Sequence, residues 1–175
     1  MKLIAFAASS STKSINKKLV TYAAGLVDGA EVEILDINDY EIPLFSQDRE
    51  EELGQPELAK AFRAKFESCD AIIISFAEHN GSYTAAYKNL FDWCSRIDRN
   101  VYQDKPMVLL SASPGGGGGA NVLAMAMKSM PYFGGEIKGS FSLAKFHANF
   151  DMVENKISDS ELDAELKKAV DSLKT

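Results

Sequence analysis

The chain has 175 residues, of which 46% are apolar and 25% are charged, a composition typical of a globular protein. This length predicts one domain over residues 1–175, large enough to bury a core. Lysine and arginine number 19 against 25 acidic residues, which gives a formal charge of −6 with neutral histidine. This balance argues against nucleic-acid and anionic-membrane partners, because such binding depends on basic residues that displace counterions.

The cysteine content and the N-terminal segment indicate a cytoplasmic protein. Cys69 and Cys94 are too few for a disulfide framework, and both lie in apolar helical patterns that predict packed, reduced thiols. The apolar stretch from Leu3 to Ala8 is shorter than the core of a signal peptide, so we expect a strand there. No apolar run approaches the roughly 18 residues that span a bilayer.

Apolar runs alternate along the chain with segments of helical periodicity. The runs predict strands over residues 3–8, 32–35, 71–76, 107–112 and 137–143. The periodic segments predict helices over residues 15–29, 56–69, 83–97, 121–130 and 158–173, the last with a capping box of Ser158 and Glu161. The acidic run from Glu50 to Glu52 is expected in a solvated loop.

Five strands separated by helices predict an α/β fold, in which helices cover both faces of a five-stranded parallel sheet. In such folds ligands bind beyond the carboxyl ends of the strands. The loops after the first, third and fourth strands are therefore where we expect a binding site.

The loop after the first strand carries five hydroxyl side chains between Ser9 and Ser14, directly before a helix. Backbone N–H groups, the helix dipole and hydroxyl donors together favour a bound phosphate. A helix cap with additional serines explains the same residues, since serine is a favoured cap. Lys13 and Lys17 either add positive charge to the loop or are solvated.

The loop after the third strand contains Asn80 and Gly81, a turn pair whose backbone N–H groups point outward, where they can bind the edge of a flat heteroaromatic ring. Its surroundings are similar to the NADPH-dependent FMN reductase family of flavodoxin-like proteins. In that family the loop has the sequence Pro-Glu-Tyr-Asn-Gly-Ser, and the next helix carries Leu-Lys-Asn-x-x-Asp-Trp. The matching residues are Glu78, Asn80, Gly81, Ser82, Lys88, Asn89, Asp92 and Trp93. Ala77, His79 and Tyr87 stand where the family has Pro, Tyr and Leu.

The resemblance extends to the other two loops and covers residues 1 to about 173. The family's phosphate loop, Gly-Ser-x-Arg-x-x-Ser-x-Asn, is matched at Ser9, Ser14 and Asn16. Ala8 and Ser11 replace the glycine and the arginine, and Lys13 is the cation that could substitute for that arginine. After the fourth strand, the family's Ser-Pro-Gly is matched by the three residues Ser113, Pro114 and Gly115.

The glycine run from Gly115 to Gly119 invites a competing interpretation. With Ala120 it satisfies the Gly-x-Gly-x-x-Gly/Ala pattern of dinucleotide-binding folds. However, five consecutive glycines satisfy almost any glycine template, and the acidic residue at the required distance, Glu136, does not end a clear strand. A flexible loop is a further alternative. We favour a wall that approaches a flavin ring and a partner subunit closely.

Other chemistries find little support in the sequence. His79 and His147 are the only histidines, and without a cysteine pair they predict no metal site. No Gly-x-Ser-x-Gly elbow indicates a serine hydrolase, and no Gly-Lys-Ser/Thr indicates a Walker loop. The three methionines Met125, Met127 and Met130 are expected to pack in the core or in an interface.

The resemblance implies an oxidoreductase that passes a hydride from NADPH or NADH through bound FMN to a quinone, a flavin or a similar small acceptor. It assigns the phosphate to Ser9, Ser11, Lys13, Ser14, Ile15 and Asn16. It assigns contact with the ring, or its border, to Glu78, His79, Asn80, Gly81, Ser82, Ser113, Gly115, Gly116 and Gly117. No catalytic side chain is expected, His79 included, because the cofactor carries the chemistry. A flavodoxin-type electron carrier and a flavin-free regulatory or interaction module remain alternatives.

The expected helix over residues 83–97 also bears on assembly. Its aromatic groups, including Tyr87, Phe91 and Trp93, surround more of the helix than one buried stripe needs. Related proteins bury this surface between subunits, so the resemblance implies a homodimer or a homotetramer. Lys88 and Asp92 are spaced as an i,i+4 pair, either a plain helix salt bridge or part of such a contact.

Overall fold

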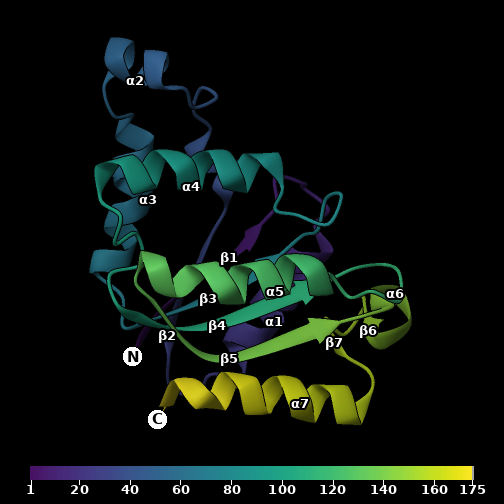
Figure 1. Ribbon diagram of the computed structural model, residues 1–175. Helices are drawn as coiled ribbons and strands as arrows, with labels where there is room; N and C mark the ends of the chain where they lie inside the picture. The colour runs from purple at the N-terminus through teal and green to yellow at the C-terminus, as the bar shows by residue number, and fades with distance from the viewer. Residues whose placement is uncertain (175) are drawn as a thin grey trace.

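A five-stranded sheet forms the centre of the computed structural model, which describes residues 1–174 (Figure 1). All its strand pairs are parallel, and their order is β2-β1-β3-β4-β5. The strands are β1 (Lys2–Ala8), β2 (Glu31–Leu35), β3 (Ala71–Phe76), β4 (Lys105–Ala112) and β5 (Gly135–Leu143). This order is that of flavodoxin-like proteins. The predicted fold class is therefore confirmed.

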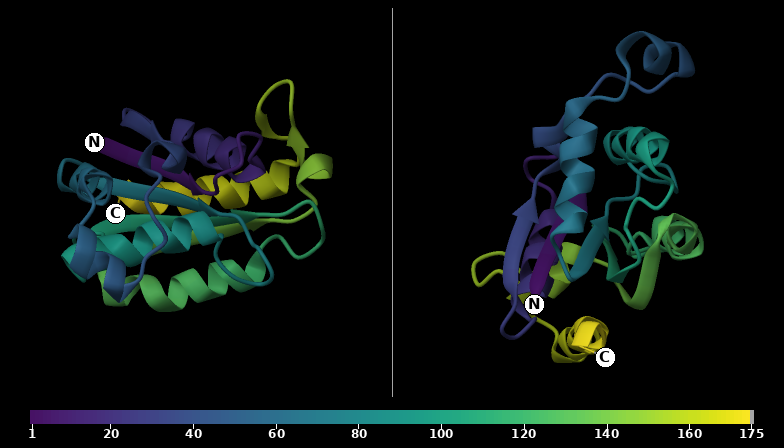
Figure 2. Two further views of the ribbon diagram at one scale, coloured as in Figure 1. Left: turned by 90° about the horizontal axis from the view of Figure 1, so that it is seen from above. Right: turned by 90° about the vertical axis from the view of Figure 1, so that its left-hand side faces the viewer.

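Helices cover both faces of the sheet and give a three-layer arrangement (Figure 2). On one face, α1 (Ile15–Gly25) and α7 (Ser160–Asp171) bury residues such as Leu19 and Leu166 in one core. On the other face, α3 (Glu57–Glu67), α4 (Ala85–Ile97) and α5 (Ala120–Ser129) bury a more aromatic core. The central strands β1 and β3 are buried on both faces, as their continuous apolar sequences predict.

Short elements complete the described part of the chain, residues 1–174. They are three 3₁₀ segments (Ile37–Tyr40, Met130–Phe133 and Ser172–Lys174), the helices α2 (Gln47–Leu53) and α6 (Phe146–Asn149), and the strand pair β6 (Phe150–Asp151) and β7 (Lys156–Ile157). α2 projects from the body at the top of Figure 1, and none of its residues is buried. Within residues 1–174, no helix combines the length and the apolar character that a membrane crossing requires.

Both edges of the sheet carry charged residues. β2 is one edge, where Glu31 and Glu33 are exposed. β5 is the other edge, and its register shifts so that Ile137 pairs with Met107 but Gly139 pairs with Val108. The residue between them, Lys138, is left without a partner position in the ladder. This bulge and these charges discourage another strand from adding to either edge.

Two predicted helix starts are wrong, and in each case the reason is a cap. α4 begins at Ala85 rather than Tyr83, because the Thr84 hydroxyl accepts a hydrogen bond from the backbone N–H of Tyr87. α7 is capped by Asp159, whose carboxylate accepts from the N–H groups of Glu161 and Leu162. The predicted capping box at Ser158 therefore does not form. α1 also ends earlier than expected, at Gly25, and Gly29 follows with φ +71°.

The acidic run from Glu50 to Glu52 is helical, which corrects the expected loop. It lies in α2, where the Ser46 hydroxyl accepts from the N–H of Arg49 and caps the helix. Asp48 and Glu50 in the first turn favour a helix N-terminus, where negative charge is stabilised. Short acidic helices of this kind carry no apolar stripe that a sequence pattern could show.

The aromatic side chains of α4 are buried within the chain itself, contrary to the expectation that they face a second subunit. Tyr87 is 1% and Trp93 0% exposed. The Trp93 indole donates to the carbonyl of Pro43 at 2.7 Å and meets Phe45 edge to face. The segment between β2 and α2 thus covers apolar surface of α4 that lies outside the stripe facing the core.

Candidate functional site

Three loops meet at the carboxyl edge of the sheet, because the strands that lead into them are neighbours in the order β1-β3-β4. Residues 9–14 follow β1, residues 77–84 follow β3, and residues 113–119 follow β4. We call them the first, third and fourth loops, after the strands that precede them. These are the loops singled out from the sequence.

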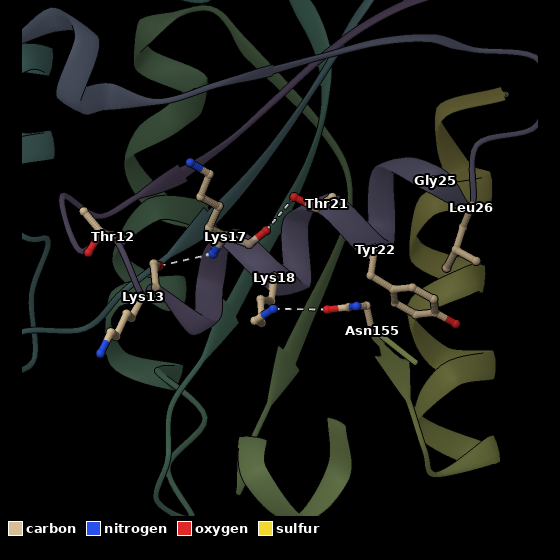
Figure 3. A pocket seen from close by; sticks show the side chains of 10 residues that line it. Thr12, Lys13, Lys17, Lys18, Thr21, Tyr22, Gly25, Leu26 and Asn155 are labelled. Atoms are coloured by element: carbon tan, nitrogen blue, oxygen red, sulfur yellow. Dashed lines mark hydrogen bonds between the residues drawn. The ribbon is translucent and has the colours of Figure 1, made fainter. Parts of the chain in front are cut away.

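The first loop leads directly into α1 (Figure 3). The Ser14 hydroxyl caps the helix by accepting from the N–H of Lys17 at 3.2 Å. Ser9 and Ser11 likewise accept from backbone N–H groups within the loop, at 3.3 and 3.2 Å. In these three bonds each hydroxyl is an acceptor, so each keeps its own hydrogen to donate elsewhere. The first N–H groups of α1, at Ile15 and Asn16, have no partner within the helix.

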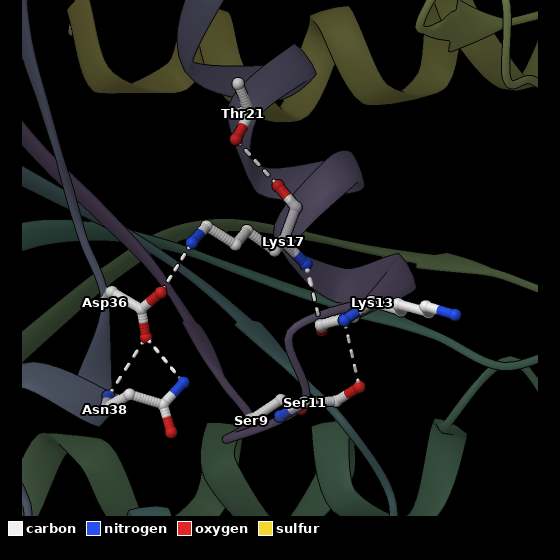
Figure 4. A network of polar contacts seen from close by, with 8 residues as sticks. Ser9, Ser11, Lys13, Lys17, Thr21, Asp36 and Asn38 are labelled. Atoms are coloured by element: carbon white, nitrogen blue, oxygen red, sulfur yellow. Dashed lines mark hydrogen bonds and ion pairs between the residues drawn. The ribbon is translucent and has the colours of Figure 1, made fainter.

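Two lysines near this loop differ in their surroundings (Figure 4). Lys17 forms an ion pair with Asp36 at 2.6 Å, and this hydrogen bond holds the pKa of the Asp36 carboxyl below its usual value. Lys13 is exposed, and its ammonium forms no ion pair within the part of the chain that the structure describes. Lys13 is therefore the cation of this loop that remains available to a ligand.

Asn16 is buried, and its side chain ties the first loop to two strands. Its carbonyl oxygen accepts from the N–H of Ala112 at 2.9 Å and from the Ser75 hydroxyl at 2.8 Å, while its amide donates to the carbonyl of Ala112 at 3.2 Å. These bonds leave little of the side chain for a ligand. The group of Asn16 that remains available to a phosphate is therefore its backbone N–H at the start of α1.

Two residues that hold the site together were missed in the sequence. The Thr84 hydroxyl donates to the carbonyl of Ala8 at 3.0 Å, so the cap of α4 also fixes the end of β1. Ser75 interrupts an otherwise apolar strand, and a buried hydroxyl requires a hydrogen-bond partner. That interruption was the available signal for Ser75, although the sequence does not say that the partner is Asn16.

The third loop forms a tight hairpin turn. His79 and Ser82 exchange two backbone hydrogen bonds, of 3.0 and 3.1 Å. Asn80 and Gly81 lie between them with φ of +52° and +76°, the arrangement of a two-residue turn with positive φ at both central positions. The N–H groups of Asn80 and Gly81 take no part in these two bonds. The predicted turn is therefore present, and His79 is exposed beside it.

Glu78 connects the third loop to α5. Its carboxylate accepts from the N–H of Val122 at 2.8 Å, and more weakly from the Asn121 amide at 3.5 Å. A carboxylate beside the first turn of a helix is stabilised by the free N–H groups there. Glu78 is among the residues assigned to the ring or its border, and in the structure its oxygens position the loop against α5.

The glycine run divides into two parts. At Gly118 and Gly119 φ is positive, and an added Cβ would lie 2.3 Å from the Ser142 hydroxyl and 3.0 Å from the Ser111 side chain. At Gly115, Gly116 and Gly117 no atom of the described residues lies within 4 Å of such a Cβ. The first three glycines border open space, whereas the last two allow close packing on β4 and β5.

The fourth loop is also held by the segment that follows β5. The N–H of Lys145 donates to the carbonyl of Gly115 at 2.8 Å, and the N–H of Phe146 donates to the carbonyl of Ser113 at 3.1 Å. The Ser113 hydroxyl donates to Gly115 at 3.2 Å. Lys145 has φ of +49°, which is uncommon for a residue with a side chain. Nothing in the sequence indicated this support.

The thiols and phenols beneath α4 belong to the core. Burial raises the pKa of the Cys94 thiol to about 12 and raises the pKa of Cys69. Burial also raises the pKa values of Tyr87 and Tyr102, whose hydroxyls are hydrogen-bonded to each other. Across residues 1–174, no group of three or more His, Cys, Asp or Glu residues could hold a metal ion.

This arrangement defines a class of protein: a flavodoxin-like fold with a hydroxyl-lined helix N-terminus and an open glycine loop at one edge of the sheet. The family model described as NADPH-dependent FMN reductase matches residues 1–148. The chain belongs to this family, and the predicted resemblance is confirmed.

Curated relatives and solved structures agree with this family. An NADPH:quinone oxidoreductase of Arabidopsis thaliana is 39% identical over 93 residues, which cover 53% of this chain and 46% of that protein. An NAD(P)H-dependent FMN reductase of Pseudomonas aeruginosa is 33% identical over 116 residues, which cover 66% and 61%. The match thus spans about half the length of the plant relative.

A similar fold is found in FerB, described as a flavoenzyme NAD(P)H:(acceptor) oxidoreductase, from Paracoccus denitrificans. The TM-score is 0.80 at 24% identity, and the match covers 98% of this chain and 94% of that one. At this identity the likeness supports the fold.

Proposed function

We propose that this protein is an FMN-dependent NAD(P)H oxidoreductase that reduces a quinone, a flavin or a similar small acceptor. Membership of the NADPH-dependent FMN reductase family over residues 1–148 carries the proposal. Relatives named quinone oxidoreductases and FMN reductases support it. Neither a flavodoxin-type electron carrier nor a flavin-free module is favoured by these names.

The first loop fits the phosphate of FMN. Ser9 and Ser14 are each only 8% exposed, and each has a hydroxyl hydrogen left to donate. The free N–H groups of Ile15 and Asn16 and the dipole of α1 favour a dianion at the same place. Ser11 and Lys13 lie on the exposed side of the loop, where Lys13 supplies the positive charge that the family takes from an arginine.

The third and fourth loops fit the edge and the border of a flat ring. The N–H groups of Asn80 and Gly81 take no part in the hydrogen bonds that close the turn. The segment from Gly115 to Gly117 borders open space. Of the remaining residues assigned to the ring, Glu78, His79 and Ser82 belong to the turn after β3 or to its support, and Ser113 belongs to the loop after β4. When bound, FMN supplies hydride acceptance and release, so these residues need only bind and orient it.

An absorbance spectrum of the protein after incubation with FMN tests the proposal, together with an assay of NADPH and NADH oxidation in the presence of quinones. We expect a bound flavin spectrum and turnover with at least one nucleotide. Bound flavin without nucleotide oxidation would indicate an electron carrier, and the absence of bound flavin would contradict the proposal altogether.

Ser14→Ala tests the phosphate assignment. We expect FMN to bind more weakly by about 1 to 3 kcal/mol, the scale of a hydrogen bond to a charged group. Ser46→Ala is the matched control, because it removes the same kind of helix cap at α2, away from the site. Equal flavin affinity in both variants, measured by fluorescence titration, would contradict the assignment.

Gly116→Val tests the open part of the glycine run. The added side chain would meet no protein atom near its Cβ, yet it would occupy space that we assign to the ring. We therefore expect weaker FMN binding with an unchanged far-UV circular dichroism spectrum. A variant that binds FMN normally would argue against a ring at this loop.

We further propose a homodimer or a homotetramer in the cytoplasm, formed by the single domain expected over residues 1–175. Met125 and Met127 on α5 are 39% and 40% exposed, and Tyr132 just beyond is 67% exposed. Such an exposed apolar group suits a contact between subunits. The free thiols Cys69 and Cys94 suit a reducing compartment. Light scattering at micromolar concentration tests the assembly, and a stable monomer would contradict it.

A further inference from the structure

A pocket of about 540 Å³ lies along the outer side of α1 (Figure 3). We call it the α1 pocket. It extends from the first loop to the last turn of the helix, and it is lined by Thr12, Lys13, Ser14, Lys17, Lys18, Thr21, Tyr22, Gly25, Leu26 and Asn155. Three of these residues are lysines and none is acidic, in a chain whose formal charge is −6. The pocket is thus a local concentration of positive charge.

Two of the three ammonium groups are not neutralised. Lys17 forms an ion pair with Asp36. Lys18 donates instead to the side-chain carbonyl of Asn155 at 3.1 Å, a neutral acceptor that leaves its charge in place. Lys13 forms no ion pair with any residue that the structure describes. The positive charge available in the pocket therefore comes from Lys13 and Lys18.

Asn155 fixes the position of Lys18. It lies in the turn between β6 and β7 with φ of +51°, a left-handed conformation that asparagine tolerates better than most residues. Its amide also donates to the carbonyl of Val153 at 3.4 Å. In Figure 3, the Lys18 and Asn155 side chains point toward each other beside α1. A turn from the other end of the sequence thus holds one ammonium group in the pocket.

An aromatic side chain lies at the far end of the pocket. The Tyr22 hydroxyl donates to Asp163 of α7 at 2.6 Å, and its ring meets Phe150 edge to face. Both contacts hold the ring in one orientation. A fixed aromatic group, the ammonium groups of Lys13 and Lys18 and the hydroxyl of Thr12 suit a ligand that combines a phosphate with a flat ring.

We propose that the α1 pocket binds the adenosine 2′-phosphate of the hydride donor, so that Lys18 makes the enzyme prefer NADPH to NADH. This inference rests on the proposed function. The pocket begins at Lys13 and Ser14, which we also assign to the phosphate of FMN, so donor and cofactor would meet at one loop. Lys13 would face both phosphates, whereas Lys18 is the un-neutralised ammonium that belongs to the α1 pocket alone, and it attracts the nearly two negative charges of a phosphate monoester.

The experiment measures binding of adenosine 2′,5′-bisphosphate to the protein saturated with FMN, so that the first loop is occupied, by calorimetry with 5′-AMP and inorganic phosphate as comparison ligands. We expect the bisphosphate to bind at least about tenfold more tightly than either, a difference on the scale of one charge-assisted hydrogen bond. Lys18→Gln should abolish the difference, and Lys13 is left in place because we assign it to the phosphate of FMN. Lys60→Gln on α3, far from the pocket in the sequence and paired with Glu57, should preserve it.

Asn155→Asp is a second, nearly isosteric variant. The new carboxylate can accept the same hydrogen bond from Lys18, but it neutralises the ammonium. We expect KM for NADPH to rise about tenfold while KM for NADH changes little, whereas Asn155→Ala should have a smaller effect. Thermal unfolding of each variant checks that the fold is retained.

Equal affinity for the bisphosphate, 5′-AMP and phosphate would overturn the proposal, because it would show a site for any anion. Unchanged nucleotide preference in Asn155→Asp and in Lys18→Gln would also overturn it. A protein that takes up no FMN and oxidises neither nucleotide would instead contradict the proposed function. The bisphosphate titration would still measure whether the α1 pocket binds a 2′-phosphate.

Discussion

The carboxyl edge of the sheet contains two sets of residues that differ in how their groups are used. A framework set forms hydrogen bonds or close contacts inside the protein: Asn16, Ser75, Glu78, Thr84 and Gly118. In an open set, one group is left free of such contacts: the ammonium of Lys13, the N–H groups of Asn80 and Gly81 in their turn, and the space beside the Cα atoms of Gly115 to Gly117. Both sets include residues of the family motifs. A motif therefore contains residues that shape the site as well as residues that face its ligand.

Asn16→Ala should give the largest loss of stability among these residues. The substitution removes three hydrogen bonds and leaves the N–H and carbonyl of Ala112 and the buried Ser75 hydroxyl without partners. Unpaired buried groups cost about 1 to 3 kcal/mol each, so we expect a loss of about 4 kcal/mol in the free energy of unfolding. Urea denaturation measures it, with the exposed Asn38→Ala as the control. A loss below about 1 kcal/mol would place Asn16 outside the framework set.

Gly118→Ala and Gly116→Ala compare the two parts of the glycine run. At Gly118 the left-handed conformation costs alanine about 1 to 2 kcal/mol, and the new Cβ displaces the Ser142 hydroxyl from its bond to Gly118. We expect a total loss of about 3 kcal/mol for Gly118→Ala. Gly116→Ala should change stability by less than about 0.5 kcal/mol. Similar losses in the two variants, measured by thermal unfolding, would remove the distinction between the two parts.

Glu78→Gln should have a smaller effect. The amide can still accept from the N–H of Val122, but the negative charge at the start of α5 is lost. We expect a loss of about 1 kcal/mol, which decreases as salt is added. A large fall in flavin affinity with little change in stability would instead move Glu78 from the framework set to the residues that contact the ring.

His79→Tyr should have the smallest effect. His79 is exposed in the turn, and its side chain supports no other loop in the structure of residues 1–174. Under the proposed function, hydride transfer to the flavin needs no protein acid. We expect the rate of flavin bleaching by NADPH, followed by stopped flow, to stay within about tenfold, or 1.4 kcal/mol in the barrier. A fall of several hundredfold with FMN still bound would show a catalytic role for His79.

The sequence predicted the strands, the class of sheet and the three loops of the site, because buried parallel strands are continuous apolar runs and their carboxyl ends lie at one edge. It could not assign residues to the two sets. The amide of Asn16 is used by Ser75 and Ala112, which lie 59 and 96 positions away. Only the folded chain shows that such a motif residue points inward.

Other differences have local causes. Ser158 and Asp159 are adjacent residues of the kind that caps helices, and the sequence does not rank them. The aromatic residues of α4 suggested a second buried surface, but that surface is covered by Pro43 and Phe45 from a segment with no regular pattern. The periodicity of the sequence does not reveal packing by an irregular segment.

The bulge at Lys138 has a consequence for the behaviour of concentrated solutions. Growth of a cross-β aggregate requires a regular, unpaired strand edge on which another chain can add hydrogen bonds in register. β5 interrupts its ladder at Lys138, and β2 presents the exposed carboxylates of Glu31 and Glu33. A chain that approaches either edge meets a broken register or charge. Native molecules can therefore crowd together while their sheets stay separate.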